Sequence, residues 1–396
     1  MKLKDTLKTI NKMTGAERLD QSTYAEVKEF YDSGNYALNR VLTGSIYTGI
    51  PKGRIVTLFG ESGSGKSLIA ANTAALALKN NEVDIVYIFD SEGGTLVNIF
   101  KQHQIDMSKV QHIPVASVEQ CAVKMIQTYD TLVQARQDYL KDPDNNDDVR
   151  AMCILDSYGA LAADKLVSDA VNKDKMAVDM GISQKMKNNM MRGLMMRVVE
   201  ANATLMIINH EYKDPAQMFA SKIHNMAGGM GIQFASHVIL QCEKLLIKAA
   251  DDAFLTGKET KEDNVGFFKG NKIKFFVVKN RVCKPAFTAT IYIDFNHGLS
   301  RYEGLVEPAV EMGFLEEVRG GYTCKTWNSG KKITYRELMS NDEIWNTFLK
   351  DFDQKSQELM KYSNSTSREL DAILESLEEK PEDEQAQPGV NDIPEE

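Results

Sequence analysis

The stretch Arg54-Ile-Val-Thr-Leu-Phe59-Gly60-Glu61-Ser62-Gly63-Ser64-Gly65-Lys66-Ser67 decides the fold. Its second half matches the pattern G-x4-G-K-[ST] at every fixed position. The first half is an apolar run typical of a buried strand, and the alanine- and leucine-rich residues 67–79 predict a helix. Glycines between a strand and a helix let backbone amides turn toward an anion, and a helix N-terminus favours negative charge. The stretch therefore predicts a nucleotide phosphate site in an α/β fold.

Two side chains of this motif have distinct expected roles. Lys66 would neutralise the β- and γ-phosphates of ATP, and the Ser67 hydroxyl would bind Mg²⁺. The alternative is a glycine- and serine-rich turn that ends in Lys-Ser by chance, but the flanking strand and helix favour the nucleotide site. The residues expected to contact ATP are Gly60, Glu61, Ser62, Gly63, Ser64, Gly65, Lys66 and Ser67.

Carboxylates follow two further apolar runs. Residues 152–155 end at Asp156, which we expect to hold the magnesium ion with Ser67. Residues 84–89 lead into Asp90-Ser91-Glu92, and hydrolysis needs a carboxylate that orients the attacking water. In a continuing strand Asp90 and Glu92 would share a face, with Glu92 nearer the carboxyl end where ligands of open α/β sheets bind. The alternative for Glu92 is a solvated loop acid.

From residue 53 onward, short β-rich runs alternate with helical stretches. Near-continuous apolar strands separated by helices predict a mostly parallel central sheet with helices on both faces, hence an α/β ATPase core. The methionines of the helix expected at 184–200 would fill the core. The expected strands are residues 54–59, 84–89, 152–155, 204–208, 237–241, 272–278 and 288–293.

Smaller attachments are expected at both ends of this core. Four apolar residues near the N-terminus fall on one helical face, which would pack on the chain's own core or dock on a neighbouring subunit. A small C-terminal α+β unit contains Trp327 and Trp345. We divide the chain into an N-terminal helical oligomerisation segment (1–35), the ATPase core with its DNA-binding loops (36–305), the small C-terminal domain (306–352) and an acidic, partly disordered tail (353–396). The four apolar residues are Leu3, Leu7, Ile10 and Met13.

The acidic charge of the chain lies in its tail. The formal net charge is −9, and residues 368–396 hold eleven acidic and two basic side chains. The rest of the chain therefore has a formal net charge of zero. A neutral body can still present a basic face, so the net charge does not exclude nucleic acid. No apolar run approaches the roughly 20 residues that span a bilayer, so no membrane partner is expected. Five cysteines without a CxxC pair indicate reduced thiols and a cytoplasmic protein.

Several segments resemble the RecA family of DNA strand-exchange recombinases, over about residues 30–325. Within the family the chain is similar to the UvsX recombinases of T4-like phages. Phage encoding would place it in the bacterial host cytoplasm. The segments are Tyr31-Asp-Ser-Gly34, Leu38-Asn-Arg-Val-Leu42-Thr-Gly44, Gly49-Ile-Pro-Lys-Gly53-Arg-Ile-Val56, Phe89-Asp90-Ser91-Glu92, Ile154-Leu155-Asp156-Ser157, Ile207-Ile208-Asn209-His210 and Lys279-Asn280-Arg281.

The resemblance implies roles for individual residues. It makes Glu92 the catalytic glutamate and His210 the sensor of the γ-phosphate, where cellular members carry glutamine. It makes Lys279 and Arg281 a basic pair that reaches a neighbouring subunit's ATP. Cellular members stack a tyrosine on adenine a few residues beyond the glutamate, whereas this chain has Ile99 and Phe100 in that region.

The resemblance also implies two loops that bind single-stranded DNA, by position about residues 172–181 and 211–231. Lysines in such loops neutralise the DNA backbone, and an apolar side chain can insert between bases. The alternative is a pair of ordinary surface loops. The expected DNA contacts are Lys173, Lys175, Lys213, Phe219, Lys222, Gly228 and Gly229.

These implications describe an ATP- and Mg²⁺-dependent recombinase. It would form a helical filament with itself on single-stranded DNA, pair that strand with homologous duplex DNA and exchange strands, in recombination-dependent repair and replication. A recombination mediator and a single-strand-binding protein are further expected partners. One alternative keeps the fold but makes the protein a ring helicase or related motor ATPase. Another is a non-catalytic filament accessory that binds ATP and DNA structurally.

Overall fold

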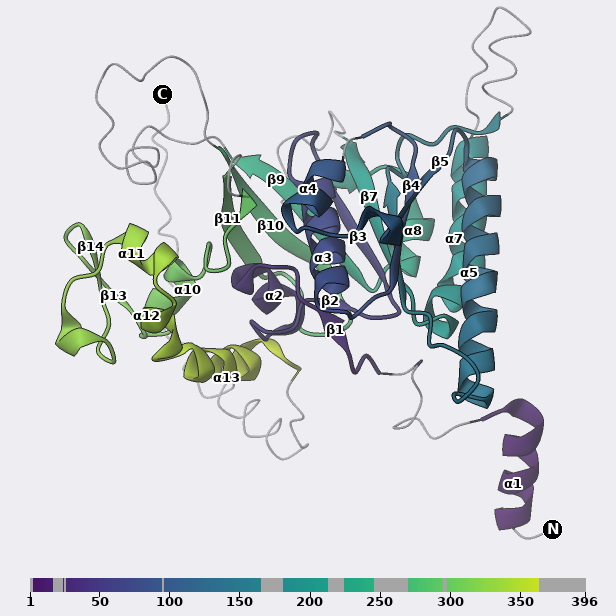
Figure 1. Cartoon of the computed structure of the whole chain (residues 1–396), viewed down its shortest axis with the longest axis horizontal. Coiled ribbons are helices and arrows are strands. Elements are labelled where there is room, and N and C mark those ends of the chain that lie inside the picture. The colour runs from purple at the N-terminus through teal and green to yellow at the C-terminus, as the bar shows by residue number, and fades with distance from the viewer. Residues whose placement is uncertain are drawn as a thin grey trace, which may run out of the picture. The chain divides into compact units, whose positions relative to one another are not determined.

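Strand β3 (Ile55–Gly60), which precedes the phosphate-loop motif, lies inside a large mixed sheet (Figure 1). This description rests on a computed structural model, which describes residues 3–16, 24, 26–94, 96–164, 181–212, 224–245, 270–294 and 298–362. The chain divides into two units, residues 1–361 and residues 362–396, and of the second only Tyr362 is described.

The strand order of the sheet is β12–β11–β10–β9–β3–β7–β6–β4–β5, and β8 pairs with β7 outside this path. Strands from β9 to β5 are parallel, whereas β10, β11 and β12 extend the sheet in antiparallel fashion. The predicted mostly parallel sheet is therefore confirmed. The strand bounds are β4 (Ile85–Asp90), β5 (Val110–Pro114), β6 (Ala151–Asp156), β7 (Thr204–Tyr212), β8 (Asn225–Met226), β9 (Val238–Leu245), β10 (Gly270–Asn280), β11 (Thr288–Asp294) and β12 (Gly298–Leu299).

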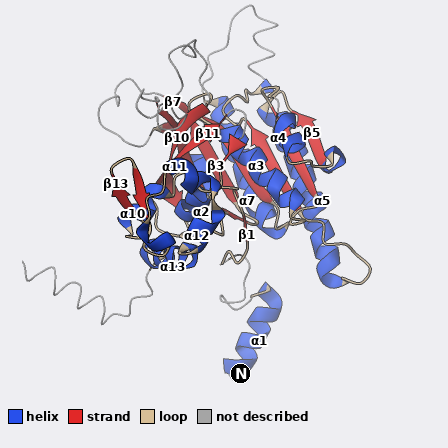
Figure 2. Ribbon diagram, turned by 60° about the vertical axis from the view of Figure 1, so that its left-hand side comes forward, coloured by secondary structure: helices blue, strands red, loops and turns tan. Residues whose placement is uncertain are grey.

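Helices cover both faces of this sheet (Figures 1 and 2). Val56 and Leu58 of β3 pack in the same apolar cluster as α3, whereas Ile55 and Phe59 pack in the cluster with α5 and α7. Because successive side chains of a strand point to opposite faces, covering both faces requires an uninterrupted apolar run. On the first face lie α2 (Tyr36–Thr43), α3 (Lys66–Lys79) and α4 (Val97–Gln102); on the second lie α5 (Val118–Lys141), α7 (Ile182–Glu200) and α8 (Met230–Ala235).

The methionines of α7 divide between core and surface. Met190 and Met191 are buried, as predicted, but the expectation was wrong for Met195 and Met196, which are 36% and 54% exposed. A helix packed on a sheet buries one stripe of its surface, so the five methionines of α7 cannot all be buried.

A small C-terminal unit packs on α2. Trp345 is fully buried, stacks on Tyr302 with ring centroids 5.1 Å apart, and donates from Nε1 to the Leu338 carbonyl. Asp353 accepts hydrogen bonds from the Ser45 hydroxyl and from a backbone amide beside it, so the tail boundary expected at residue 353 falls inside a packed helix. The elements are α10 (Val306–Glu311), β13 (Glu316–Val318), β14 (Gly321–Thr323), α11 (Tyr335–Ser340), α12 (Asp342–Asn346) and α13 (Leu349–Met360).

The N-terminal helix α1 (Leu3–Thr14) forms over the residues that the apolar spacing predicts, and Gly15 follows it with φ 66°. None of its residues is buried, and its four apolar side chains are 47–82% exposed. Short strands β1 (Phe30–Tyr31) and β2 (Ile50–Pro51) pair beside α2. No helix among the described residues is both long and apolar enough to cross a bilayer. The acidic residues 368–396 lie outside the described part of the chain.

Candidate active site

The phosphate-loop glycines have the conformations that the motif requires. Gly63 and Gly65 have φ of 74° and 75°, a region that side chains disfavour, and Gly65 directly precedes α3. A Cβ added at Gly60 would come within 2.0 Å of the Cys242 carbonyl oxygen on β9, so only glycine fits there. The loop is thus a tight connection that exposes backbone amides at the N-terminus of a 14-residue helix.

Lys66 is held at this loop by oxygen atoms. Its ammonium donates to the carbonyls of Gly60 (3.0 Å) and Glu61 (2.6 Å) and to the Ser64 hydroxyl (3.3 Å). The side chain is 5% exposed, and burial lowers its pKa below the ordinary lysine value. A cation with neutral partners in a desolvated position is well placed to exchange a carbonyl for a phosphate oxygen.

Ser67 and Asp156 meet although they are 89 residues apart in the chain. The Ser67 hydroxyl donates to Asp156 Oδ2 at 2.7 Å, where β6 ends. Asp156 is 8% exposed, and burial, then the nearby carboxylates of Glu92 and Asp90, raise its pKa. A divalent cation would offset the cost of ionising Asp156 at this buried position, so the two oxygen atoms of Ser67 and Asp156 fit Mg²⁺. The described residues contain no cluster of three or more His, Cys, Asp or Glu that could hold a metal.

Glu92 lies beside His210 and Ser157. Its Oε1 is 2.6 Å from His210 Nε2, and it accepts a short hydrogen bond from the Ser157 hydroxyl, whose oxygen is 3.0 Å from the same histidine nitrogen. Burial alone would raise the pKa of Glu92, but the hydrogen bonds from Ser157 and His210 outweigh it and lower the pKa. The carboxylate is therefore ionised at neutral pH, as a group that orients water must be.

Glu92 lies beyond the carboxyl end of β4, as expected, but the expectation that it continues the strand was wrong. Strand β4 ends at Asp90, and Glu92 follows in a turn, so the two residues do not share a strand face. Ser157, which follows Asp156 across a cis peptide bond, was assigned no role from sequence, although it contacts Glu92 and His210. Its position directly after an acid that ends an apolar run was the available signal.

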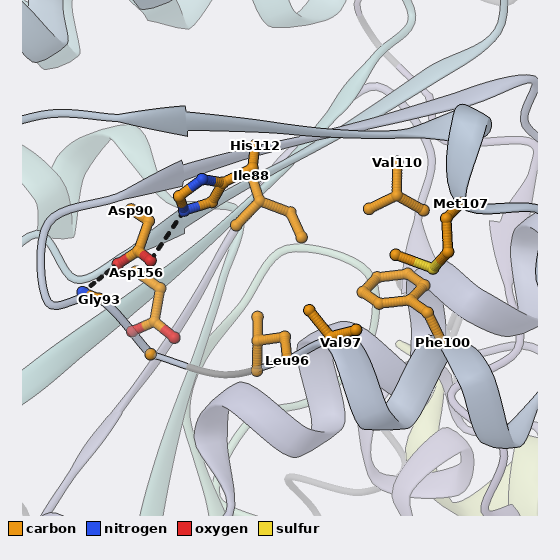
Figure 3. Close-up of a pocket in the computed structure, with 11 residues that line it drawn as sticks. Ile88, Asp90, Gly93, Leu96, Val97, Phe100, Met107, Val110, His112 and Asp156 are labelled. Carbon is orange, nitrogen blue, oxygen red and sulfur yellow. Dashed lines mark hydrogen bonds and ion pairs between the residues drawn. The ribbon is translucent and has the colours of Figure 1, made fainter.

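A cavity of about 380 Å³ lies beside the phosphate loop. Ile99 of α4 lines it, whereas its neighbour Phe100 is fully buried and lines a different cavity (Figure 3). The wall opposite α4 comes from β10, β11 and β12, which sequence reasoning did not connect to the site. The remaining lining side chains from these elements are Asn98, Gln102, Asn271, Ile273, Ile293 and Asp294.

Lys279 and Arg281 lie at the other edge of the sheet from the phosphate loop. Strand β10 is antiparallel to β9, and Lys279 pairs with Ile239, near the start of β9, whereas Gly60 pairs with Cys242 further along it. Lys279 Nζ donates to the carbonyls of Gln233 (2.6 Å) and Phe234 (3.4 Å), which end α8, and Arg281 also donates to Phe234. The basic pair therefore faces away from its own subunit's phosphate loop.

The expected DNA contacts are only partly described. Lys173, Lys175, Lys213, Phe219 and Lys222 lie outside the described residues. Gly228 and Gly229 are described, and both pack closely: an added Cβ would come within 2.2 Å of the Tyr158 ring and 1.2 Å of Gln184 Nε2, respectively. The Tyr158 ring gives Gly228 a packing reason, both glycines have a positive φ (88° and 72°) that side chains disfavour, and their contact with DNA stays a prediction. Residues 213–223 connect β7 to β8, which pair with each other.

Comparison with known proteins agrees with this geometry. Residues 1–300 match the RecA N-terminal domain family. The chain is 26% identical over 288 residues to the recombination and repair protein of Enterobacteria phage T4, covering 73% of this chain and 65% of that protein. It is 24% identical over 338 residues to RecA of Mycoplasma pneumoniae (85% and 88% of the two chains) and 26% over 353 residues to RecA of Aquifex aeolicus (86% and 87%). The protein belongs to the RecA family.

Proposed function

We propose that the protein is an ATP-dependent recombinase that polymerises on single-stranded DNA and exchanges strands with a homologous duplex. The family match and the relatives in recombination and repair support this assignment. The observation that carries it is the contact of Ser67 with Asp156 and of Glu92 with His210 at one edge of a RecA-family sheet. The five cysteines are free thiols, which supports a cytoplasmic location.

Hydrolysis depends on charges that these side chains already hold in place. Glu92 orients the attacking water toward the γ-phosphate, and Lys66 offsets the charge that develops on the phosphate oxygens. Mg²⁺, held by Ser67 and Asp156, supplies Lewis-acid stabilisation of the same charge when bound. His210, which lies on β7 and contacts the Glu92 carboxylate, has the role of sensing the γ-phosphate in this proposal.

Assembly completes the site. Lys279 and Arg281 stabilise the charge on the ATP of an adjacent subunit, because the antiparallel course of β10 keeps them from their own phosphate loop. Hydrolysis is therefore fast only in the filament. ATP binding favours the DNA-bound state, and hydrolysis favours release.

DNA contacts come from the two segments that the resemblance implies, about residues 172–181 and 211–231, which carry the predicted lysines. The second segment includes the end of β7, the strand that carries His210, so the nucleotide and the DNA would both act on β7. The acidic tail at 368–396 competes with DNA for basic surfaces or recruits a mediator or single-strand-binding protein.

The test is ATP hydrolysis measured with and without single-stranded DNA, for the wild type and for Glu92→Gln. DNA should stimulate the wild type strongly, and Glu92→Gln should lose at least about 100-fold in kcat while retaining DNA binding. Absence of stimulation, or hydrolysis indifferent to Glu92, would overturn the proposal and favour a structural filament accessory.

A further inference from the structure

The backbone that carries Glu92 has little steric support. Gly93 and Gly94 follow it directly, and a Cβ added at either would meet no described atom within 4 Å. Next to this turn is a cavity of about 340 Å³, lined mainly by apolar side chains including Leu96 and Val97 (Figure 3). Two glycines beside open space leave many backbone conformations accessible, so packing alone does not fix the position of Glu92.

Ser157 and His210 hold the side chain of Glu92, and Asp90 restrains the backbone of the turn through hydrogen bonds. Its Oδ1 accepts from the backbone amides of Glu92 (2.9 Å) and Gly93 (2.8 Å), and its Oδ2 is 3.0 Å from His112 Nε2 (Figure 3). Asp90 is 7% exposed. Burial opposes its ionisation, but the hydrogen bonds from His112 and the two amides outweigh burial and lower its pKa. The anchor is thus an ionised carboxylate in which both oxygens are engaged.

His112 fixes this carboxylate from the neighbouring strand. It lies on β5 opposite Ile88 of β4, and its ring must donate from Nε2 because an ionised carboxylate can only accept. His112 has 59% of its side chain exposed, so its contact with Asp90 is not a by-product of core packing. Ser91 forms hydrogen bonds with the main chains of Asp156 and Ser157 instead of with Asp90. The carboxylate of Asp90 therefore binds the amides of Glu92 and Gly93.

We propose that Asp90 and His112 form a positioning pair that holds the Glu92 turn in its hydrolytic geometry. Neither touches the nucleotide; both act through the backbone of Glu92. The inference rests on the proposed function, since it requires Glu92 to be the water-orienting carboxylate. A displacement of about 1 Å in such a group costs up to about 100-fold in rate.

The first experiment measures kcat and KM for ATP in the presence of saturating single-stranded DNA. Asp90→Ala should lower kcat by roughly 10- to 100-fold and leave KM, ATP affinity and DNA affinity within about twofold. Asp90→Asn is the matched control: its Oδ1 still accepts both amides but its NH2 group cannot accept from His112, so its loss should resemble that of His112→Ala and be smaller than that of Asp90→Ala. His112→Ala should lower kcat less, and His112→Gln, whose amide can donate to Asp90, should restore it.

A double-mutant cycle separates positioning from general stability. In the Glu92→Gln background, Asp90→Ala should slow the residual hydrolysis by no more than about twofold, because the group that it positions is already inactive. Melting temperatures of all variants, measured in parallel, show whether any has failed to fold. His112→Ala, on an exposed edge position, keeps the test informative if Asp90→Ala is unstable.

The outcomes that count against the pair differ from those that count against the proposed function. If Glu92→Gln leaves hydrolysis unchanged, the proposed function itself fails. If Glu92→Gln is inactive but neither Asp90→Ala nor His112→Ala lowers kcat, the positioning pair is wrong and Glu92 keeps its role. The pair is also wrong if Asp90→Ala costs as much in the Glu92→Gln background as in the wild type, or if Asp90→Asn is as slow as Asp90→Ala.

Discussion

The two edges of the central sheet present charges in different ways. At the carboxyl edge of β4, β6 and β7, Glu92, Asp156 and His210 contact partners from other segments of the same chain, where we propose that the nucleotide binds. At the end of β10, Lys279 and Arg281 contact main-chain carbonyls that end α8. One edge carries the carboxylates of Glu92 and Asp156, and the other carries two cations that contact main-chain carbonyls. This difference supports the proposal that the site is divided between adjacent subunits.

Removing Lys66 should have the largest effect. Lys66→Ala eliminates the cation held at the phosphate loop, so ATP hydrolysis should fall by at least about 1,000-fold and ATP affinity should fall as well. Equilibrium binding of a fluorescent ATP analogue together with steady-state hydrolysis checks this. Because Lys66 and Glu92 belong to the same edge, mixing Lys66→Ala with Glu92→Gln should give no recovery of hydrolysis, and recovery in that mixture would contradict the comparison.

Removing the basic pair should be nearly as severe, but it should be repairable in trans. The double variant Lys279→Ala/Arg281→Ala should lose roughly 100- to 1,000-fold in DNA-dependent hydrolysis while the isolated subunit still binds ATP. Glu92→Gln retains an intact basic pair. Mixed filaments of the two inactive proteins should recover up to about a quarter of the wild-type rate, since one interface in four combines both intact halves.

No recovery on mixing, at protein concentrations where both variants bind DNA, would show that Lys279 and Arg281 serve their own subunit or none. A control mixture of Lys66→Ala with Glu92→Gln must stay inactive, because both variants are defective on the same side of the interface.

The fold could be predicted from the sequence much more fully than the site. Apolar runs before Gly60 and Asp156 are long and continuous because both faces of those strands are buried, and such a pattern is local. By contrast, the exposed strand β5, which carries His112, has no continuous apolar run and was not predicted. The Asp90–His112 contact depends on strand register, and the contact of Ser157 with Glu92 depends on how two loops end, neither of which is encoded in residue spacing.

The charge state of Lys279 gives a smaller effect that depends on pH. Burial, and then repulsion from Arg281, lower the pKa of Lys279 to about 8. The side chain is cationic below that pH and loses its charge above it in the nucleotide-free protein, so DNA-dependent kcat/KM should fall roughly fourfold between pH 7 and pH 8.5. Lys279→Arg should flatten this part of the profile, because arginine stays charged. An equal fall in both proteins would assign the pH dependence to another group.

The smallest expected effect lies away from both edges. Glu303 is buried and bonded to Tyr335, and burial raises its pKa to about 7. The folded state therefore binds more protons than the unfolded chain between about pH 4.5 and 7, and stability falls as pH rises through this window. Ionising the buried Glu303 lowers the free energy of unfolding at high pH. Glu303→Gln should therefore raise the free energy of unfolding by about 3 kcal/mol at pH 8 and leave it unchanged at pH 4. Thermal melts at both pH values check this, and hydrolysis should not change.

Strand exchange between circular single-stranded DNA and linear duplex DNA tests the central claim most directly. With ATP and Mg²⁺, the wild type should form joint molecules with a homologous duplex and none with a heterologous one, and Lys66→Ala should form none with either. Unwinding of duplex DNA regardless of homology, with no joint molecules, would contradict the account and assign the same fold to a ring-forming motor.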